Sequence, residues 1–176
     1  KMAVSNTEAT VESTVDRVNS DLLDIRQIFN AANYNIVQEF DISSEKFAEQ
    51  FSLLYEVNSD KIESLALYGN EGRLIASEPV AVEKENIDVT GQDWYKNAES
   101  AIENVHFSVP HIQNLYEDGL YRYHWVVSLS RYVDINDGEI PGSGVLLVDM
   151  KYSVIEDVLK QINDSSEGIY YYMISR

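Results

Sequence analysis

The first forty residues carry a hydrophobic pattern typical of one long amphipathic helix. Apolar residues recur at alternating spacings of four and three, as in the a/d seam of a heptad repeat: Val11, Val15, Val18, Leu22, Ile25, Phe29, Ala32 and Ile36. Neither Pro nor Gly interrupts the stretch from Met2 through Ile42. About 35 helical residues would measure about 50 Å, which exceeds the width of a compact domain of this size. We therefore predict that the half from Leu22 onward packs on the domain and that the first half projects toward a partner helix.

Three shorter helices are predicted further along the chain. Apolar side chains repeat at helical spacing over Phe47–Tyr55, with Ser43 or Ser44 in the N-cap position. The same spacing occurs over Asp93–Ile102. It recurs over Tyr152–Ile162, where a serine and a glutamate three residues apart form a capping box.

From Lys61 the period changes to two, which is typical of strands. The stretch KIESLALYGNEGRLIASEP predicts a hairpin around Gly69–Gly72. Three further strands of the sheet are predicted over Val105–Gln113, Tyr121–Asp134 and Gly144–Met150, and one additional strand outside this sheet is predicted over Gly168–Ile174. The turns that join the last three strands of the sheet, Asp134–Gly144 among them, are too short for a crossover helix, so the sheet is predicted to be antiparallel. The fold class is α+β, with a long N-terminal helix packed on a five-stranded antiparallel sheet.

The strand Tyr121–Asp134 has two faces of different character, because alternate side chains of a strand point to opposite sides. One face is bulky and apolar: Tyr121, Tyr123, Trp125, Val127, Leu129 and Val133. The other is mixed: Arg122, His124, Val126, Ser128, Ser130 and Tyr132. We predict that Trp125 on the first face is buried together with Phe29, Ile36 and Phe51. The second face is either the floor of a pocket or a solvated surface.

Composition and charge exclude several functional classes. With 30 acidic and 13 basic residues the chain carries a formal charge of −17 and would repel a phosphate backbone, so no nucleic-acid partner is predicted. There is no Cys, and His106, His111 and His124 lack the spacing of metal ligands, so no metal and no cofactor are predicted. Ser128 and Ser130 share a strand with His124 but lack the local context of a nucleophile. We predict no catalytic residue and no enzymatic activity for this domain.

Three segments carry a resemblance to a known family: Gln92-Asp93-Trp94-Tyr95-Lys96-Asn97-Ala98, Val109-Pro110-His111 and Gly144-Val145-Leu146-Leu147-Val148-Asp149. In this order and spacing they resemble the Cache (PAS-like, PDC) extracytoplasmic sensor domain, in particular the membrane-distal half of a double Cache module. The runs 106–131 and 144–159 are most similar to bacterial sensor histidine kinases of the YesM type. The resemblance implies a signalling and dimerisation helix over residues 1–42, a PAS-like sensor domain over 43–163, and the start of a membrane-proximal subdomain over 164–176.

The resemblance also implies which residues bind a ligand. In amino-acid-binding members an Arg two residues before the Trp, the Trp and the following Tyr hold the carboxylate, while a second Tyr and an Asp hold the amino group. Trp94, Tyr95 and Asp149 match this pattern, whereas Gln92 stands in place of the Arg and His111 in place of the second Tyr. A neutral amide cannot supply the bidentate charged contact of a guanidinium group. The expected ligand is therefore an amine or a polyhydroxylated compound in preference to an amino acid.

The predicted pocket lies on the sheet face opposite the long helix. Its ligand-binding residues are Gln92, Trp94, Tyr95, His111, Arg122, His124 and Asp149. Arg122 offers a positive charge that would replace the missing guanidinium group. Structural roles stay open: Trp94 and Tyr95 also suit a helix anchor in the core, and Asp149 also suits a cap of the helix that follows.

As a whole, the resemblance implies the extracellular ligand-sensing input domain of a transmembrane two-component sensor histidine kinase. The full-length protein would be anchored in a bacterial cell membrane and form a parallel homodimer through its N-terminal helix. One alternative is the ligand-binding domain of a chemoreceptor or a cyclase. Another is a dimerisation or protein-interaction module with no small-molecule ligand, whose own side chains fill the pocket.

Overall fold

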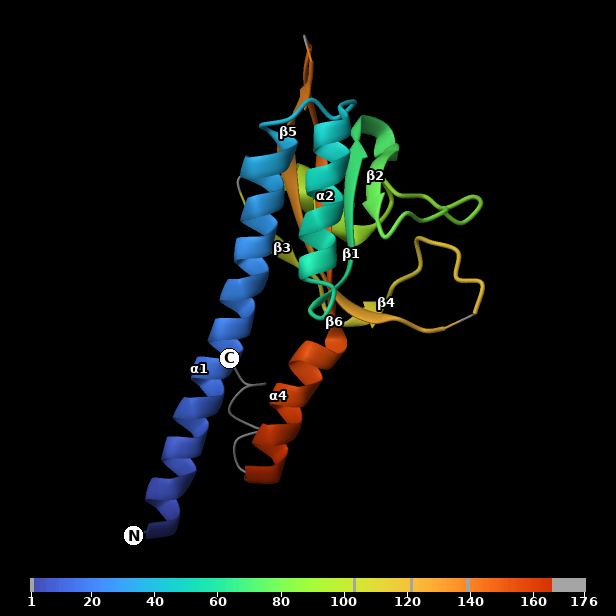
Figure 1. Ribbon diagram of the computed structural model, residues 1–176. Helices are drawn as coiled ribbons and strands as arrows, with labels where there is room; N and C mark the ends of the chain where they lie inside the picture. The colour runs from blue at the N-terminus through green and yellow to red at the C-terminus, as the bar shows by residue number, and fades with distance from the viewer. Residues whose placement is uncertain (1, 103, 121, 139, 166–176) are drawn as a thin grey trace.

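The computed structural model of the protein describes residues 2–102, 104–120, 122–138 and 140–165 (Figure 1). The helices are α1 (Met2–Asn30), η1 (Ala31–Val37), α2 (Glu45–Val57), η2 (Asn70–Gly72), α3 (Asp93–Ser100) and α4 (Tyr152–Ser165). The strands are β1 (Ile62–Gly69), β2 (Leu74–Glu78), β3 (His106–Phe107), β4 (His111–Ile112), β5 (Trp125–Asp137) and β6 (Ile140–Lys151). They form one sheet in the order β2-β1-β6-β5-β3, with β4 also paired to β5, and every pair is antiparallel. The predicted α+β class and antiparallel sheet are confirmed.

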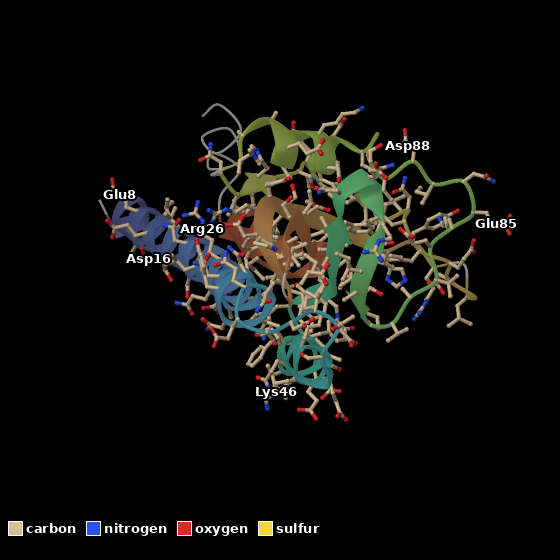
Figure 2. All side chains as sticks on the ribbon, turned by 90° about the horizontal axis from the view of Figure 1, so that it is seen from above. Glu8, Asp16, Arg26, Lys46, Glu85 and Asp88 are labelled. Carbon is tan, nitrogen blue, oxygen red and sulfur yellow. The ribbon has the colours of Figure 1, made fainter. Side chains whose placement is uncertain are left out.

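Helices cover the two faces of the sheet unequally. Seen from above, α1 and α2 lie on one side of the sheet and α3 on the other (Figure 2). The side chains buried under α1, η1 and α2 form what we call the aliphatic core: Ile25, Ile28, Phe29, Ala32, Ile36, Val37, Phe47, Phe51, Ile62, Leu65, Leu67, Val127, Leu129, Val133, Ile135, Leu146, Val148 and Met150. The predicted joint burial of Phe29, Ile36 and Phe51 is therefore confirmed.

The long helix changes character before its predicted end. At Ala31 the α-helix gives way to a π-helix that runs to Val37, whereas the apolar pattern predicts a regular helix through Ile36 and the resemblance extends it to residue 42. A π-helical turn holds an extra residue and so shifts the face that follows it. Ile36 and the adjacent Val37 are both buried on the sheet in this way. The chain then turns away, and the backbone N–H of Ile42 donates to the carbonyl of Asn136 on β5 at 2.9 Å.

The first half of α1 extends beyond the sheet, as predicted, but it does not stand alone. Figure 1 shows α4 beside this half of α1, and the two helices are in contact. Among the described helices, none combines the length and the apolar character that a membrane crossing requires. The predicted strand Gly168–Ile174 lies outside the described residues.

Among the shorter helices, α2 begins at its predicted capping residue. Ser44 is the N-cap of α2, and its hydroxyl accepts a hydrogen bond from the backbone N–H of Phe47 at 3.1 Å. α3 ends at Ser100, so that Ile102, predicted to be the last residue of this helix, lies outside it and is exposed. α4 begins at Tyr152 as predicted, but Ser153 of the predicted capping box then lies inside the helix and is not its N-cap.

Two strand boundaries differ from the prediction. The stretch Asp134–Gly144 is not a turn, because β5 and β6 stay paired until Asp137 meets Ile140. Gly144 indicated a turn by its residue type, yet it sits within β6, where a Cβ atom would overlap the carbonyl oxygen of Tyr68 on β1. The single strand predicted over Val105–Gln113 is instead the two short strands β3 and β4, which flank Pro110, a residue without a backbone donor.

The predicted burial of Trp125 is wrong. Its side chain is 51% exposed, because β5 begins at this residue and the preceding Arg122–His124 belong to a loop. The indole ring lies near the ring of Tyr152 at the start of α4, with ring centroids 6.3 Å apart. Further along the same strand face, Val127 and Leu129 are buried in the aliphatic core as predicted.

Candidate functional site

The sheet face under α3 buries aromatic and polar side chains. Its apolar members form what we call the aromatic core: Ala66, Tyr68, Val89, Trp94, Tyr95, Ala98, Leu115, Tyr116, Val145 and Leu147. The ring of Tyr68 lies 5.3 Å from that of Trp94, centroid to centroid. The Tyr68 hydroxyl is 2.8 Å from the Tyr116 hydroxyl, within hydrogen-bond distance. Each of these two hydroxyls therefore has a buried partner.

The carboxylate of Asp149 lies on the same face, near the end of β6. Asp149 is only 1% exposed, and its oxygens accept hydrogen bonds from the hydroxyls of Ser128 at 2.5 Å and Ser64 at 3.1 Å. Burial raises the pKa of Asp149, while the two hydroxyls, the positive charge of a protonated His111 and a hydrogen bond from Gln113 act in the opposite direction. The hydrogen bonds that lower this pKa come from neutral side chains. A ligand with a positive charge would compensate the buried negative charge.

His111 is connected to this carboxylate through Ser128. The Nε2 atom of His111 is 3.3 Å from the Ser128 hydroxyl oxygen, and its Nδ1 atom is 2.9 Å from the carbonyl oxygen of Val109. A hydroxyl has a single hydrogen, which Ser128 donates to Asp149. Ser128 therefore links His111 to Asp149. A change of charge on either of these two side chains alters the hydrogen bonds of the other.

A cleft of about 790 Å³ opens next to this cluster. It lies between the segment that follows β2 and the segment between β4 and β5, which are drawn at the right of Figure 1. Its lining residues are Glu63, Ser64, Pro79, Val80, Ala81, Val82, Lys84, Ile112, Gln113, Asn114, Tyr116, Glu117, Asp118, Gly119, Arg122, Tyr123 and His124. Ser64 and Gln113 contact Asp149, and Tyr116 contacts Tyr68, so the inner wall of the cleft is also the shell of the buried polar cluster.

Charged side chains form the rim of the cleft. The Nδ1 atom of His124 is 2.7 Å from the carboxylate of Glu63, and its Nε2 atom is 2.8 Å from that of Asp118. The side chain of Arg122 also contacts Asp118, at 3.2 Å. Hydrogen bonds from the backbone of Leu120 and from His124, together with Arg122, lower the pKa of Asp118 to about 2. His124 thus connects the loop before β5 to the start of β1.

Metal ligation has no support in this arrangement. Within the described ranges of the chain, no three His, Asp or Glu side chains converge so that they would hold a metal ion. A second hollow, of about 280 Å³, lies at the turn between β5 and β6 and is lined by Gln38, Asp134–Gly138 and Pro141. It is far along the sheet from Asp149, because Asp149 pairs with Ser128 near the other end of β5.

The structure brings together five of the seven predicted site residues. Arg122 and His124 line the cleft, while Asp149 and His111 lie in the polar cluster behind it. Trp94 adjoins this cluster through its ring, next to Tyr68, and through its carbonyl oxygen, which accepts from the hydroxyl of Ser130 at 2.8 Å.

The other two predicted site residues are not in this group. Gln92 is the N-cap residue of α3, and its side chain donates to the backbone carbonyl of Asp88 at 3.2 Å. Tyr95 is buried, and its hydroxyl donates to the carbonyl oxygen of Gly69 at 3.2 Å. Neither residue lines the cleft, and Tyr95 serves as an anchor between α3 and β1.

Sequence reasoning missed several residues of this site. Ser64 had a signal, since it is a short polar residue inside the otherwise apolar segment SLALYG. Tyr116 and Asp118 lie in a stretch that reads as a turn, with no periodicity to place their side chains. Gln113 and Glu63 likewise gave no signal, because their role depends on how two distant loops meet.

Comparisons with known proteins add the fold family. No protein-family model matches the sequence, and no curated protein matches it. Among solved structures, the ligand-binding domain of the Pseudomonas aeruginosa amino acid chemoreceptor PctC in complex with GABA matches at 17% identity and a TM-score of 0.64, over 90% of this chain and 65% of that one. The domain of the Pseudomonas fluorescens chemoreceptor CtaA in complex with L-alanine matches at 18% identity and a TM-score of 0.63, over 90% and 64%.

A third solved structure extends the comparison. The ligand-binding domain of the P. aeruginosa chemoreceptor PctB in complex with L-Arg matches at 19% identity and a TM-score of 0.60, over 93% of this chain and 58% of that one. The chain thus spans less than two thirds of each of these solved domains. At these identities the likeness concerns the fold, and the fold of this chain is that of the Cache-type ligand-binding domains of bacterial chemoreceptors.

Proposed function

We propose that this chain is the extracytoplasmic ligand-sensing domain of a membrane-anchored bacterial receptor, and that it binds a small molecule carrying an ammonium group. The observation that carries the proposal is the buried carboxylate of Asp149, held by the neutral hydroxyls of Ser64 and Ser128 behind an open cleft. Burying a carboxylate without a cationic partner costs free energy. A bound ammonium group would supply the positive charge and make strong charge-assisted hydrogen bonds.

The ligand class in this proposal is wider than the one expected from the sequence. GABA, L-alanine and L-arginine, which occupy the three solved domains, all carry an ammonium group, but they also carry a carboxylate. These ligands speak against the preference for compounds other than amino acids. The neutral side chain of Gln92 does not decide the matter, because it lies outside the cleft, whereas Lys84 and Arg122 line it. A polyhydroxylated compound is the weaker choice, because it brings no charge to Asp149.

The receptor class that we propose is a chemoreceptor. All three of the solved domains described above belong to chemoreceptors, which favours this reading over a sensor histidine kinase of the YesM type. In either receptor the domain binds its ligand without transforming it. The chemical response would come from a separate output domain.

We also propose that the full-length receptor is a parallel dimer through the first half of α1. The side chain of Val15 in this half is 42% exposed, as a residue on a free contact surface would be. Cysteine variants at Val11 and Val15 of the membrane-anchored receptor should form disulfide cross-links between protomers. Leu53→Cys, an exposed position on α2, serves as the control and should not cross-link. Absence of a cross-link at both valine positions would refute the dimer.

A ligand screen by thermal unfolding tests the sensing function. A compound that binds only the folded protein stabilises it by RT ln(1 + [L]/Kd), about 2.7 kcal/mol at a hundred times Kd. We expect at least one compound among the twenty amino acids, small amines and simple sugars to raise the melting temperature. Asp149→Asn should abolish this rise, whereas Asp157→Asn, an exposed change on α4, should leave it intact.

Two results would contradict the proposal. If no compound stabilises the protein, the domain is better explained as a protein-interaction module whose aromatic core is filled by its own rings. If a compound stabilises the wild type and the Asp149→Asn variant equally, the protein binds a ligand but not at this carboxylate.

A further inference from the structure

A second carboxylate near the site has no explanation in the fold. The Oε1 atom of Glu83 is buried and has no hydrogen-bond partner within the described part of the chain. Glu83 lies on the segment between β2 and α3, where it pairs with Tyr116 through an isolated antiparallel bridge. Buried polar atoms without a partner are rare and costly, and they frequently mark the place of a missing ligand.

The carboxylates of Glu83 and Asp149 act on the same pair of tyrosines. Burial is the largest cause that raises the pKa of Tyr68 and of Tyr116, and the negative charges of Glu83 and Asp149 raise both further. The two tyrosine hydroxyls are hydrogen-bonded to each other. Glu83 adjoins this pair through its backbone bridge to Tyr116, and both carboxyl groups influence the same two hydroxyls.

This region adjoins the cleft. Tyr116 lines the cleft, and so do Val82 and Lys84 on either side of Glu83. Two backbone hydrogen bonds join the segments that carry these residues. The N–H of Lys84 donates to the carbonyl oxygen of Leu115 at 2.9 Å, and the N–H of Glu117 donates to the carbonyl oxygen of Val82 at 2.8 Å. Glu83 thus lies between two residues of the cleft wall and next to Tyr116, a third residue of that wall.

We propose that the ligand is a short aliphatic diamine, with one ammonium group at Asp149 and the other at Glu83. This inference rests on the proposed sensing function and narrows the ligand class. An α,ω-amino acid of the same length would bring its carboxylate toward Glu83, where like charges repel each other. A monoamine would leave Glu83 uncompensated. The alkyl chain of a diamine would pack against Tyr68 and Tyr116, whose rings also attract cations.

The charge of the protein favours the same class of ligand. Glu63, Glu117 and Asp118 line the cleft together with Lys84 and Arg122, and the chain as a whole has a formal charge of −17. A negative potential at the mouth of a cleft raises the local concentration of cations, more strongly for a dication than for a monocation. Association of a diamine should therefore slow as the salt concentration rises.

Isothermal titration calorimetry at low ionic strength with three four-carbon compounds tests the inference. These are 1,4-diaminobutane, 1-aminobutane and 4-aminobutanoate, which differ only at one end. We expect the diamine to bind at least tenfold more tightly than the monoamine, because the second charged contact is lost in the monoamine. Glu83→Gln should bring the diamine to within about threefold of the monoamine and leave the monoamine unaffected.

Glu85→Gln is the matched control, because Glu85 lies on the same segment but is exposed and points away from the sheet (Figure 2). It should leave all three affinities unchanged apart from a small loss of long-range attraction. The comparison of the three compounds on the unaltered protein decides the inference even if the Glu83→Gln variant fails to fold.

The outcomes separate this inference from the proposed function. If 4-aminobutanoate or another amino acid binds more tightly than the diamine, the inference is refuted and the sensing function stands. The same holds if Glu83→Gln folds and leaves the diamine affinity unchanged. If neither these compounds nor the wider screen gives binding, both proposals fall.

Discussion

The two faces of the sheet come from the same strands but bury different chemistry. Under α1, η1 and α2 the described buried side chains are apolar except for the uncharged Asn33 of η1, whose Oδ1 atom accepts from Gln38 at 3.2 Å. Under α3 the aromatic core surrounds buried polar groups, namely Ser64, Ser128, Ser130 and Asp149. Burying apolar surface stabilises the fold, whereas burying a carboxylate opposes it. The difference indicates that one face supplies stability and the other carries recognition.

Strand β1 shows how one segment serves both faces. Leu65 and Leu67 belong to the aliphatic core, while Ala66 and Tyr68 belong to the aromatic core. Strict alternation predicts that Ile62 lies with Ala66 and Tyr68, and this prediction is wrong. An irregularity between Ile62 and Ser64 shifts the register, so that Ile62 joins the aliphatic core while Ser64 reaches Asp149.

The largest effect is expected from the aliphatic core. Phe29 is fully buried there, and Phe29→Ala should lower the free energy of unfolding by about 3–5 kcal/mol through lost burial and the cavity left behind. Urea unfolding measures this loss. Leu23→Ala, an exposed change on the same helix, should cost less than about 0.5 kcal/mol. Similar losses for both variants would contradict the assigned packing of α1.

A smaller loss is expected from the aromatic core. Tyr68→Phe removes one partner of the Tyr68–Tyr116 hydrogen bond and leaves the Tyr116 hydroxyl buried without it. The cost should be about 1–3 kcal/mol, and adding Tyr116→Phe should recover part of it, because neither hydroxyl then lacks a partner. A double-mutant cycle by urea unfolding measures this coupling. Purely additive losses would show that the two hydroxyls do not interact.

Asp149→Asn is the one substitution among these predictions that should raise the free energy of unfolding. Burial raises the pKa of Asp149 in the folded protein, so its ionisation opposes folding at pH values above the ordinary Asp pKa, near 4. Near neutral pH the variant should therefore be more stable than the wild type, by about 1 kcal/mol. The gain should shrink as the pH falls from the raised pKa of the folded protein toward about 4, and it should be lost below about 4, because the wild-type carboxyl is then protonated in both states. A gain that persists at low pH would contradict the assigned cause.

The smallest effect is expected at the surface contact that joins α1 to the sheet. The ammonium group of Lys61 is 2.6 Å from the carboxylate of Asp24, and this hydrogen bond raises the pKa of Lys61. Both side chains are partly exposed, so Lys61→Met should cost at most about 1 kcal/mol. The cost should decrease in 1 M salt, which screens the pair. A loss as large as that of Phe29→Ala would mean that the docking of α1 depends on charge.

Much of the fold was predictable because its signals are local. The heptad pattern around Phe29, the N-cap at Ser44 and the period of two in β1 each depend on neighbouring residues alone. The errors arose where distant segments decide the outcome. Gly144 reads as a turn residue, but it is needed for the close approach of β1 to β6.

The site was predictable only in part. The resemblance predicted Asp149 as a ligand-binding residue, and the alternation of side chains along β5 predicted that Ser128 lies on the mixed, polar face of the strand. Glu83 lies in a segment without periodicity, and its proximity to Tyr116 arises from a bridge between two loops. Neither the segment around Glu83 nor the segment around Tyr116 has a sequence pattern that predicts this bridge.

A crystal structure of the protein with its most strongly stabilising ligand would test the central claim most directly. We predict ligand density in the cleft, with an ammonium nitrogen about 2.7–3.2 Å from the carboxylate of Asp149 and the side chain of Gln113 displaced. Density in the hollow beside Gln38 and Pro141, with the shell of Asp149 unchanged, would contradict the assignment of recognition to the α3 face.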